Sequence, residues 1–370
     1  MQFIDLKTQY NKIKDQVDKS IIKVLESGAY IGGPEITQLE EQLAEFAGVK
    51  HCLACSNGTD ALLIPLMAWD VKPGDAVFTT SFTFIASGEV IALRGATPVF
   101  VDIDPDTYNM CPDSLENAIQ KVINTTNLNP KAIIPVDLFG LAADYTKLNA
   151  IAKKYNMKVL EDGAQSFGGT YKGQRTASFG DAASTSFYPA KPLGAYGDAG
   201  ASFTNDDSMI EIFRSIRVHG MGTDKYDNIR IGINGRMSTI QAAVLLAKLT
   251  IFEDELVARE RIARNYHQLL DGKVKIPTTP ENYTSAWAQY TIQVESPEKR
   301  NEIFNRFKEN GIPYSVFYPL PLHMQTAYKD ICINADDMSK SEFAAERVFS
   351  IPMHPYLEEK DQERIANLIY

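Results

Sequence analysis

The stretch Ser184-Thr-Ser-Phe-Tyr-Pro-Ala-Lys191-Pro-Leu-Gly-Ala-Tyr-Gly-Asp-Ala-Gly200 contains a lysine in an unusual setting. Prolines lie within two residues of Lys191 on both sides, aromatic residues precede it, and three glycines follow it. Proline fixes the local backbone, and glycine lets the backbone approach a ligand closely. An amine in such a rigid, poorly hydrated turn can have a lowered pKa and attack a carbonyl group. An ordinary loop lysine is the alternative interpretation of this stretch alone.

A second stretch, Met157-Lys-Val-Leu-Glu-Asp162-Gly-Ala-Gln165-Ser166, places a carboxylate at the end of a predicted strand. Val159 and Leu160 indicate a short buried strand, and open α/β sheets bind ligands beyond the carboxyl ends of their strands. A buried carboxylate favours the charged form of a cationic partner. Asp162 is therefore expected to meet a bound ligand and to keep a ring nitrogen of that ligand protonated.

A third stretch, Ser56-Asn-Gly58-Thr59-Asp60-Ala-Leu-Leu, follows an apolar run and opens a predicted helix. A helix start offers unpaired backbone N–H groups and hydroxyls to a phosphate. A nucleophilic amine, a carboxylate for a ring nitrogen and a phosphate cup together predict a site for pyridoxal phosphate (PLP).

Short apolar strands alternate with helices through most of the chain. Strands are predicted at 51–55, 76–80, 98–102 and 132–136, and helices at 59–67, 85–93, 114–123 and 145–155. This alternation predicts an α/β protein with a mainly parallel sheet. Residues 184–187 and 199–204 are expected to be antiparallel strands that flank the Lys191 loop. Residues 223–234 are polar and are predicted to form a surface excursion before a long helix that ends near Leu270.

The pattern changes after that long helix, where a strand at 287–294 and helices at 297–310, 339–348 and 359–369 are predicted. A chain of 370 residues is long enough for two domains. We therefore predict an N-terminal segment and large domain over 1–250 and a small C-terminal α+β domain over 251–370.

Charge and cysteine content exclude several functions. The formal charge is −10, with 37 basic and 47 acidic residues and no basic cluster, so binding to nucleic acid or to an anionic membrane is not expected. The chain begins without a signal peptide and contains no apolar run of membrane-spanning length, which predicts a cytoplasmic protein. Cys52 and Cys55 form a C-x-x-C pair without a second pair, and we interpret them as small core residues rather than as a metal or redox site.

Six motifs occur in a fixed order along the chain. They are Gly28-Ala-Tyr-Ile-Gly-Gly-Pro34-Glu35, Ser56-Asn-Gly-Thr-Asp-Ala-Leu62, Glu161-Asp-Gly-Ala-Gln-Ser166, the Lys191 stretch, Asn234-Gly-Arg236-Met and Ile351-Pro-Met-His-Pro-Tyr356. With these motifs the chain resembles, essentially end to end, the sugar aminotransferases of the DegT/DnrJ/EryC1/StrS family. The resemblance implies the fold-type-I architecture of PLP-dependent transferases (aspartate aminotransferase-like), with a large mainly parallel-sheet domain and a small C-terminal domain.

The resemblance also implies further cofactor contacts. Phe84 is expected to stack on the pyridoxal ring, and Gln165 to contact its 3-hydroxyl oxygen. Ser186, Gly58 and Thr59 are expected at the phosphate.

A neighbouring subunit is implied as well. In the family, the loop that corresponds to 223–236 crosses into the partner subunit. Asn234 would then meet the partner's cofactor phosphate, and Arg236 would meet the substrate. The resemblance thus implies a homodimer with two shared sites.

The reaction implied by the resemblance is transamination of a keto sugar nucleotide. L-Glutamate gives its amino group to the cofactor, which becomes pyridoxamine phosphate, and leaves as 2-oxoglutarate. The sugar ketone then receives the amino group, and Lys191 serves as both covalent anchor and acid/base.

The substrate that the resemblance favours is UDP-2-acetamido-2-deoxy-3-oxo-D-glucuronate, aminated at C3 on the route to the diacetamido uronic acids of bacterial surface polysaccharides such as O-antigen. A forked guanidinium suits the uronate carboxylate, so Arg236 is the candidate contact, with Tyr318 as a hydroxyl donor. Phe317 stands where relatives have histidine, which removes a polar group from the same neighbourhood. Phe317, Tyr30 and His323 are further candidate substrate contacts.

Two other functions compete with this prediction. One is amination of a UDP- or dTDP-linked 4-keto-6-deoxy sugar, and the other is a non-catalytic PLP-binding regulator. Related sugar dehydratases have histidine at the position of Lys191. The lysine in this chain therefore argues against a dehydratase. The presence of both Asp162 and Lys191, without an added basic segment, favours an enzyme.

Overall fold

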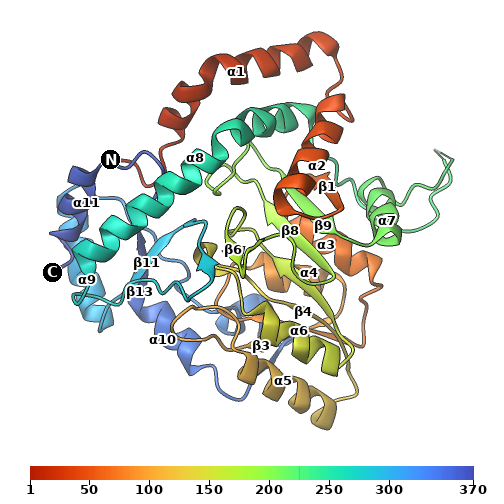
Figure 1. Ribbon diagram of the computed structural model, residues 1–370. Coiled ribbons are helices and arrows are strands. Elements are labelled where there is room, and N and C mark those ends of the chain that lie inside the picture. Colours follow the sequence, from red (N-terminus) through yellow and green to blue (C-terminus); the bar gives the residue numbers. More distant parts are fainter. Residues whose placement is uncertain (225) are drawn as a thin grey trace.

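The computed structural model describes residues 1–224 and 226–370, and a sheet of eight strands lies at its centre (Figure 1). The strand order is β1-β9-β8-β5-β4-β2-β3-β12. The strands are β1 His51–Cys55, β2 Asp75–Thr80, β3 Thr97–Val101, β4 Asn129–Ile134, β5 Lys158–Asp162, β8 Ala182–Ser186, β9 Gly200–Thr204 and β12 Ile333–Asn334.

Most neighbouring strands in this sheet are parallel, which confirms the prediction from the alternation of strands and helices. β2 pairs in parallel with β3 and with β4, β4 pairs with β5, and β5 pairs with β8. β8 and β9 are antiparallel, as expected for the strands that flank the Lys191 loop, and β9 pairs antiparallel with β1. β12 extends the sheet in parallel beside β3 and was not predicted, because two residues carry no periodic signal.

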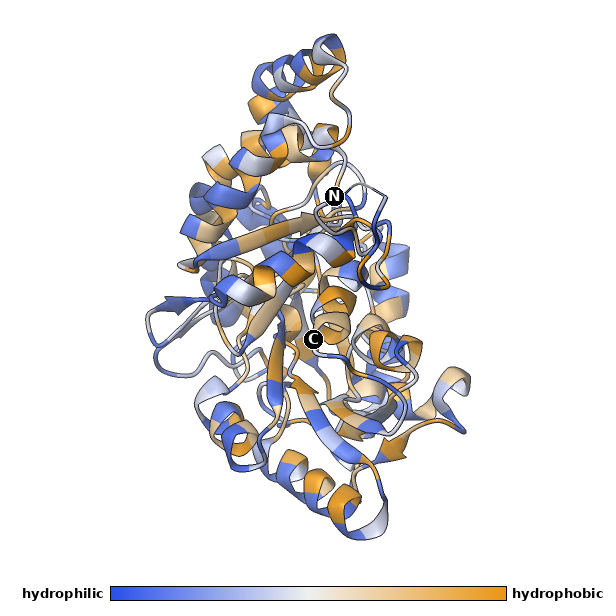
Figure 2. Ribbon diagram, turned by 90° about the vertical axis from the view of Figure 1, so that its right-hand side faces the viewer, coloured by the Kyte–Doolittle hydropathy of each residue, from blue (hydrophilic) through white to orange (hydrophobic). Residues whose placement is uncertain are grey.

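Every helix that the sequence predicts is present, with ends that differ by a few residues. The helices are α1 Leu6–Ser27, α2 Pro34–Ala47, α3 Gly58–Ala68, α4 Ala86–Leu93, α5 Pro112–Thr125, α6 Tyr145–Lys154, α7 Asp207–Arg217, α8 Thr239–Leu270, α9 Pro297–Glu309, α10 Ser339–Arg347 and α11 Glu359–Ala366. The outer helices mix hydrophilic and hydrophobic residues within the same turns (Figure 2), the pattern of helices with one buried face.

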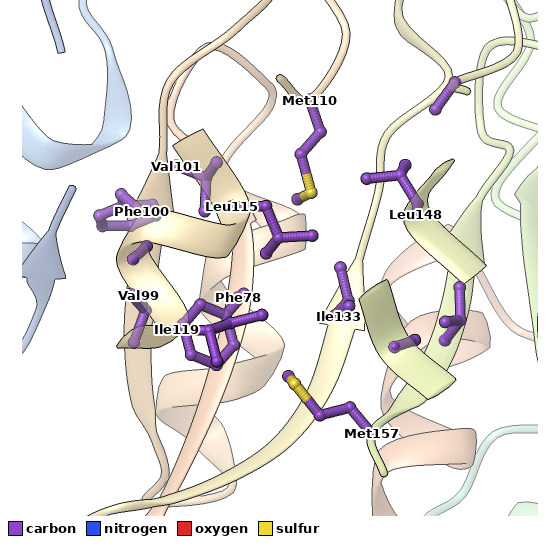
Figure 3. Close-up of a cluster of buried hydrophobic side chains, with 14 of the residues drawn as sticks. Phe78, Val99, Phe100, Val101, Met110, Leu115, Ile119, Ile133, Leu148 and Met157 are labelled. Carbon is purple, nitrogen blue, oxygen red and sulfur yellow. The ribbon is translucent and has the colours of Figure 1, made fainter. Parts of the chain in front are cut away.

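Helices cover both faces of the sheet because neighbouring strand residues point to opposite sides. On one face, Phe78 of β2 and Ile133 of β4 pack with Leu115 and Ile119 of α5 (Figure 3). The residue adjacent to Phe78, Val77, packs on the other face with side chains from α3, α4 and α7. The two cores hold the strand ends in a fixed order, and the site is built at those ends.

The C-terminal part has its own apolar cluster around the antiparallel strands β11 Tyr290–Gln293 and β13 Val348–Ile351. Ile262 and later residues of α8 belong to this cluster, whereas Leu245 and Phe252 of α8 pack with side chains from the large sheet. α8 therefore runs unbroken through residue 250, where the two domains were expected to divide. That division stays a prediction.

A small three-stranded sheet was also missed by the sequence. Its strands are β6 Thr170–Tyr171, β7 Gln174–Arg175 and β10 Tyr283–Thr284. Short 3-10 turns occupy Leu138–Gly140, Leu322–Met324 and Thr326–Tyr328. Two- and three-residue elements of this kind depend on contacts with distant segments, so local periodicity does not indicate them.

Cys52 and Cys55 are buried in apolar clusters on opposite faces of β1, as expected for core residues. In residues 1–224 and 226–370, no group of three or more His, Cys, Asp or Glu side chains is arranged to hold a metal ion. None of the helices in the described chain combines the length and the apolar character needed to cross a membrane. The predicted surface excursion over 223–234 follows α7, and its residue 225 lies outside the described residues.

Candidate active site

A cavity of about 740 Å³ lies beyond the carboxyl ends of the central parallel strands. Its walls come from the ends of β5 and β8, the starts of α3 and α4, the Lys191 loop and the C-terminal part. The lining residues predicted from the sequence are Gly58, Thr59, Phe84, Asp162, Gln165, Ser186, Lys191, Phe317 and Tyr318. These residues span 58–318 in the chain, and the fold gathers them around one space.

Asp162, the last residue of β5, is a buried carboxylate with fixed partners. Oδ2 accepts a 2.7 Å hydrogen bond from the hydroxyl of Ser87, and Oδ1 accepts one of 3.2 Å from the backbone N–H of Ala164. Burial raises the pKa of Asp162, while these hydrogen bonds and the charge of Lys191 act in the opposite direction. These hydrogen bonds orient the Asp162 carboxylate, and a cationic partner stabilises its charged form.

Lys191 projects into the same cavity from the loop between β8 and β9. Its backbone N–H donates to Tyr188 O at 2.8 Å, and Ala195 N–H donates to Phe187 O at 2.7 Å, so the loop is a closed turn. Burial lowers the pKa of Lys191, and the negative charge of Asp162 opposes this shift. A lowered pKa increases the fraction of neutral amine, the form that attacks a carbonyl.

The start of α3 forms an anion cup beside Lys191. Asn57 caps the helix, because its Oδ1 accepts a 2.7 Å hydrogen bond from Asp60 N–H. Gly58 and Thr59 are the first two residues of α3 and line the cavity. Their backbone N–H groups come before the capped N–H of Asp60, and at this end of the helix the dipole stabilises a bound phosphate. A Cβ on Gly58 would lie 2.7 Å from Ser186 Cβ, so only glycine allows α3 and β8 to meet this closely.

An aromatic and amide wall completes the cavity. Gln165 Oε1 accepts a 2.8 Å hydrogen bond from Phe139 N–H, and Gln165 Nε2 donates to the Tyr318 hydroxyl at 3.2 Å. The ring centres of Phe84 and Tyr318 are 6.3 Å apart, and Phe84 is half exposed. Phe317 packs at 6.4 Å against Phe3, which brings the N-terminal segment to the cavity.

Four predicted residues do not line this cavity. Arg236 donates a 2.7 Å hydrogen bond to Asn234 Oδ1, and both lie beside the end of β1, where Gly235 O accepts from Ser56 N–H. A role for this pair in a partner subunit stays a prediction.

The other two are Tyr30 and His323. Tyr30 lies half exposed between α1 and α2. His323 is held between Ser81 Oγ at 2.6 Å and Glu342 Oε1 at 3.1 Å, with a nearly buried side chain. The structure therefore brings neither residue to the cavity of its own chain.

Several cavity residues were missed by sequence reasoning. Asn57 carried a usable signal, because Asn directly before a helix is a preferred cap. Ser87 and Asp198 carried none, since ordinary polar residues on a helix or loop acquire a role only through tertiary contacts. Phe3 and Ile4 also line the cavity, although the helix α1 separates them in sequence from every other wall element.

A second pair of buried acids lies behind Asp162. Asp137 accepts hydrogen bonds from Ala143 N–H at 2.9 Å, Tyr145 Oη at 2.8 Å and Ser166 Oγ at 2.8 Å. Glu161 accepts from the backbone N–H groups of two residues in the segment that precedes β8, at 2.5 and 2.8 Å. Burial raises the pKa of Asp137 to about 6, and burial together with the charge of Asp137 raises that of Glu161. Such a pair is stabilised by holding one proton.

The residues around the cavity fit PLP. A desolvated amine, an oriented carboxylate, a helix start in contact with a serine, and an exposed aromatic face match the aldehyde, ring nitrogen, phosphate and ring of that cofactor. Gly58 lets the helix start approach Ser186 closely, because a Cβ there would lie 2.7 Å from Ser186 Cβ.

Comparison with known proteins supports this interpretation. Residues 11–370 match the model of the DegT/DnrJ/EryC1/StrS aminotransferase family. The chain is 47% identical to the UDP-2-acetamido-2-deoxy-3-oxo-D-glucuronate aminotransferase of Pseudomonas aeruginosa, over 97% of this chain and 96% of that protein.

Solved structures agree. A DegT/DnrJ/EryC1/StrS aminotransferase from Brucella abortus is 51% identical, with a TM-score of 0.98 over 100% of this chain and 98% of that chain. A Streptococcus pneumoniae protein, described as the PLP form of a sugar aminotransferase, is 28% identical, with a TM-score of 0.88 over 96% of this chain and 95% of that chain. The chain is thus an enzyme of the DegT/DnrJ/EryC1/StrS aminotransferase family, with the fold-type-I architecture of PLP-dependent transferases.

Proposed function

We propose that this enzyme is a PLP-dependent aminotransferase that moves an amino group from L-glutamate to C3 of UDP-2-acetamido-2-deoxy-3-oxo-D-glucuronate. The observation that carries the reaction class is the position of Lys191 and Asp162 on one cavity, beside the helix start at Gly58. Similarity to the P. aeruginosa enzyme supports the substrate. L-Glutamate as donor, a cytoplasmic location and a role in bacterial surface polysaccharide synthesis are parts of the proposal that rest on the resemblance.

The chain's own residues would hold the cofactor in a defined way. PLP supplies a carbonyl for the amine and a protonated ring that accepts electrons. Lys191 would hold it covalently, and Asp162 would keep a proton on the ring nitrogen. The first turn of α3 and Ser186 would bind the phosphate, while Phe84 would cover one ring face.

Lys191 Nζ is also the group that moves the proton. Its lowered pKa favours the neutral amine, which can take a proton from Cα of the amino donor and later return one to C3 of the sugar. Asp162 lies close enough to interact with the charge of Lys191. The same carboxylate would therefore stabilise the protonated ring nitrogen of PLP and the protonated form of Lys191. One lysine therefore serves both half-reactions.

The substrate brings negative charge that one chain does not balance. Among the lining residues of the described chain, Lys191 is the only cation. A diphosphate and a uronate carboxylate need further partners, and Arg236 of a second subunit is the proposed partner for the carboxylate. This arrangement makes a homodimer part of the proposal.

A substrate comparison tests the proposed function. The purified enzyme with PLP and L-glutamate is offered the 3-oxo uronate and, separately, a UDP-4-keto-6-deoxy-N-acetyl sugar, with 2-oxoglutarate release as the readout. A markedly higher kcat/KM for the uronate, lost selectively in Arg236→Ala, is expected. Preference for the 4-keto sugar would overturn the substrate, and PLP binding without turnover on either sugar would favour a regulator.

A further inference from the structure

Lys248, on α8, is a fully buried lysine outside the cavity. Its Nζ donates a 2.5 Å hydrogen bond to Gly194 O and lies 4.5 Å from the centre of the Tyr196 ring. Both contacts are with the loop that carries Lys191. Lysine is rarely buried completely unless it is paired, because removing its charge from water is costly.

A second residue of α8 contacts the same loop. Gln241 Oε1 accepts a 2.8 Å hydrogen bond from Tyr196 N–H. Gln241 and Lys248 are two helical turns apart and therefore lie on one face of α8. Lys248 binds a carbonyl oxygen of the loop, and Gln241 binds a backbone N–H of the loop. Two points of the loop are therefore fixed relative to α8.

The surroundings of Lys248 keep the contact dry. Ile13 and Val17 of α1 pack with Val244 and Ala247 of α8 in a cluster that includes Tyr196. Burial lowers the pKa of Lys248 to about 8, against the charge of Glu255, so most of this lysine is still charged at pH 7. A charge-assisted hydrogen bond in such surroundings is stronger than a neutral one.

We propose that Lys248 is a positioning residue for Lys191: together with Gln241, it fixes the 188–197 loop to α8 and thereby sets the place of Lys191 Nζ relative to Asp162. The inference rests on the proposed function, because it assumes that Lys191 is the reacting amine. The turn bonds of Lys191 and Ala195 hold the loop to itself, and Leu193 and Ala195 pack in an apolar cluster that includes Leu245 of α8. Lys248 and Gln241 add hydrogen bonds, which are directional, to this apolar packing.

Hydrogen–deuterium exchange on the full-length, cofactor-free protein tests the anchoring without relying on activity. In Lys248→Met, the amides of Lys191, Ala195 and Tyr196 are expected to exchange at least tenfold faster, while β2 and β4 keep their wild-type protection. Arg264→Met is the matched control, because it removes a charge from the exposed side of the same helix and is expected to change none of these amides. Unchanged exchange in the 188–197 loop of Lys248→Met would overturn the anchoring.

Kinetics of the holoenzyme test the consequence for Lys191. A misplaced reacting group costs roughly 100-fold in rate for an error of about 1 Å, so Lys248→Met is expected to lose about tenfold to 100-fold in kcat with little change in KM. Lys248→Arg keeps the charge and is expected to recover most of the lost kcat and loop protection.

If Lys248→Met and Lys248→Arg both exchange faster throughout the protein and lose equal amounts of kcat, Lys248 has a general structural role and the proposal is overturned. A wild-type enzyme without transaminase activity would instead contradict the proposed function, and the exchange result would still decide whether Lys248 anchors the loop.

Discussion

The hydroxyl of Ser87 on α4 donates a 2.7 Å hydrogen bond to Oδ2 of Asp162 on β5, and both side chains are buried. This bond lowers the pKa of a carboxyl that burial raises. A serine on a helix thus supports the charge of the carboxylate that is proposed to meet the cofactor ring nitrogen.

Replacing Ser87 by alanine is therefore expected to weaken cofactor binding. Hydrogen bonds to charged groups contribute about 1.5–3 kcal/mol, so Ser87→Ala should raise the PLP dissociation constant by roughly tenfold or more. The pKa of Asp162 should also rise, and binding should fail at a higher pH on acidification than in the wild type. Absorbance titration of the cofactor-free protein measures both effects. Ser27→Ala, at the exposed end of α1, is the control, and equal affinities for all three proteins would contradict the prediction.

Gly58→Ala is expected to disturb the anion cup. The new Cβ would lie 2.7 Å from Ser186 Cβ, so α3 and β8 must separate at the phosphate end of the cavity. PLP affinity should fall by roughly tenfold or more, because the helix N-terminus and the serine no longer converge on one anion. Gly173→Asn is the control, since Gly173 has open space around it and a positive φ that asparagine tolerates. Wild-type affinity in Gly58→Ala would show that the phosphate binds elsewhere.

The Asp137–Glu161 pair predicts a pH dependence of folding stability. Both pKa values are raised in the folded protein, so the stabilisation is complete below their unfolded values and is lost as pH rises through the folded ones. For Asp137, a change from 3.8 to about 6 corresponds to roughly 3 kcal/mol.

Asp137→Asn should remove much of this loss, because an amide can donate to Glu161 without titrating. Urea unfolding of the cofactor-free protein between pH 4 and 8 measures the difference. Asp206→Asn, a change at an exposed helix cap, should keep the wild-type slope. The same slope in Asp137→Asn would mean that the two acids do not share a proton.

Subunit exchange tests the sharing of sites. Lys191→Ala and Arg236→Ala are each expected to be inactive, but a mixed dimer would contain one site with both residues intact. Activity should therefore return after mixing, up to about half of the wild-type activity per dimer that has exchanged. If mass measurement confirms mixed dimers and activity stays absent, Arg236 does not act across the interface.

Local backbone signals explain how much of the site the sequence could predict. Lys191 is marked by its prolines and glycines, Asp162 by the end of an apolar strand, and Gly58 by the start of a helix. Each signal lies within a few residues of the functional group. The structure places all three on one cavity, although they lie on separate elements.

The residues that escaped prediction depend on long-range packing. Ser87 of α4 contacts Asp162, and Lys248 of α8 contacts the loop that carries Lys191. Nothing in their neighbouring sequence distinguishes them from ordinary helical residues. β12 joins the large sheet from the C-terminal part with only two residues. Tertiary contacts, rather than local propensity, fix all of these features.

The most direct test is to locate the lysine that carries the cofactor. The wild-type protein is loaded with PLP, treated with borohydride to make the lysine linkage permanent, digested, and analysed by mass spectrometry. We expect the label on the peptide that contains Lys191, and Lys191→Ala should take up PLP without acquiring a label and should lose transaminase activity by several orders of magnitude. A label on another lysine, such as Lys248, or substantial activity in Lys191→Ala, would contradict the assignment of Lys191 as the reacting amine.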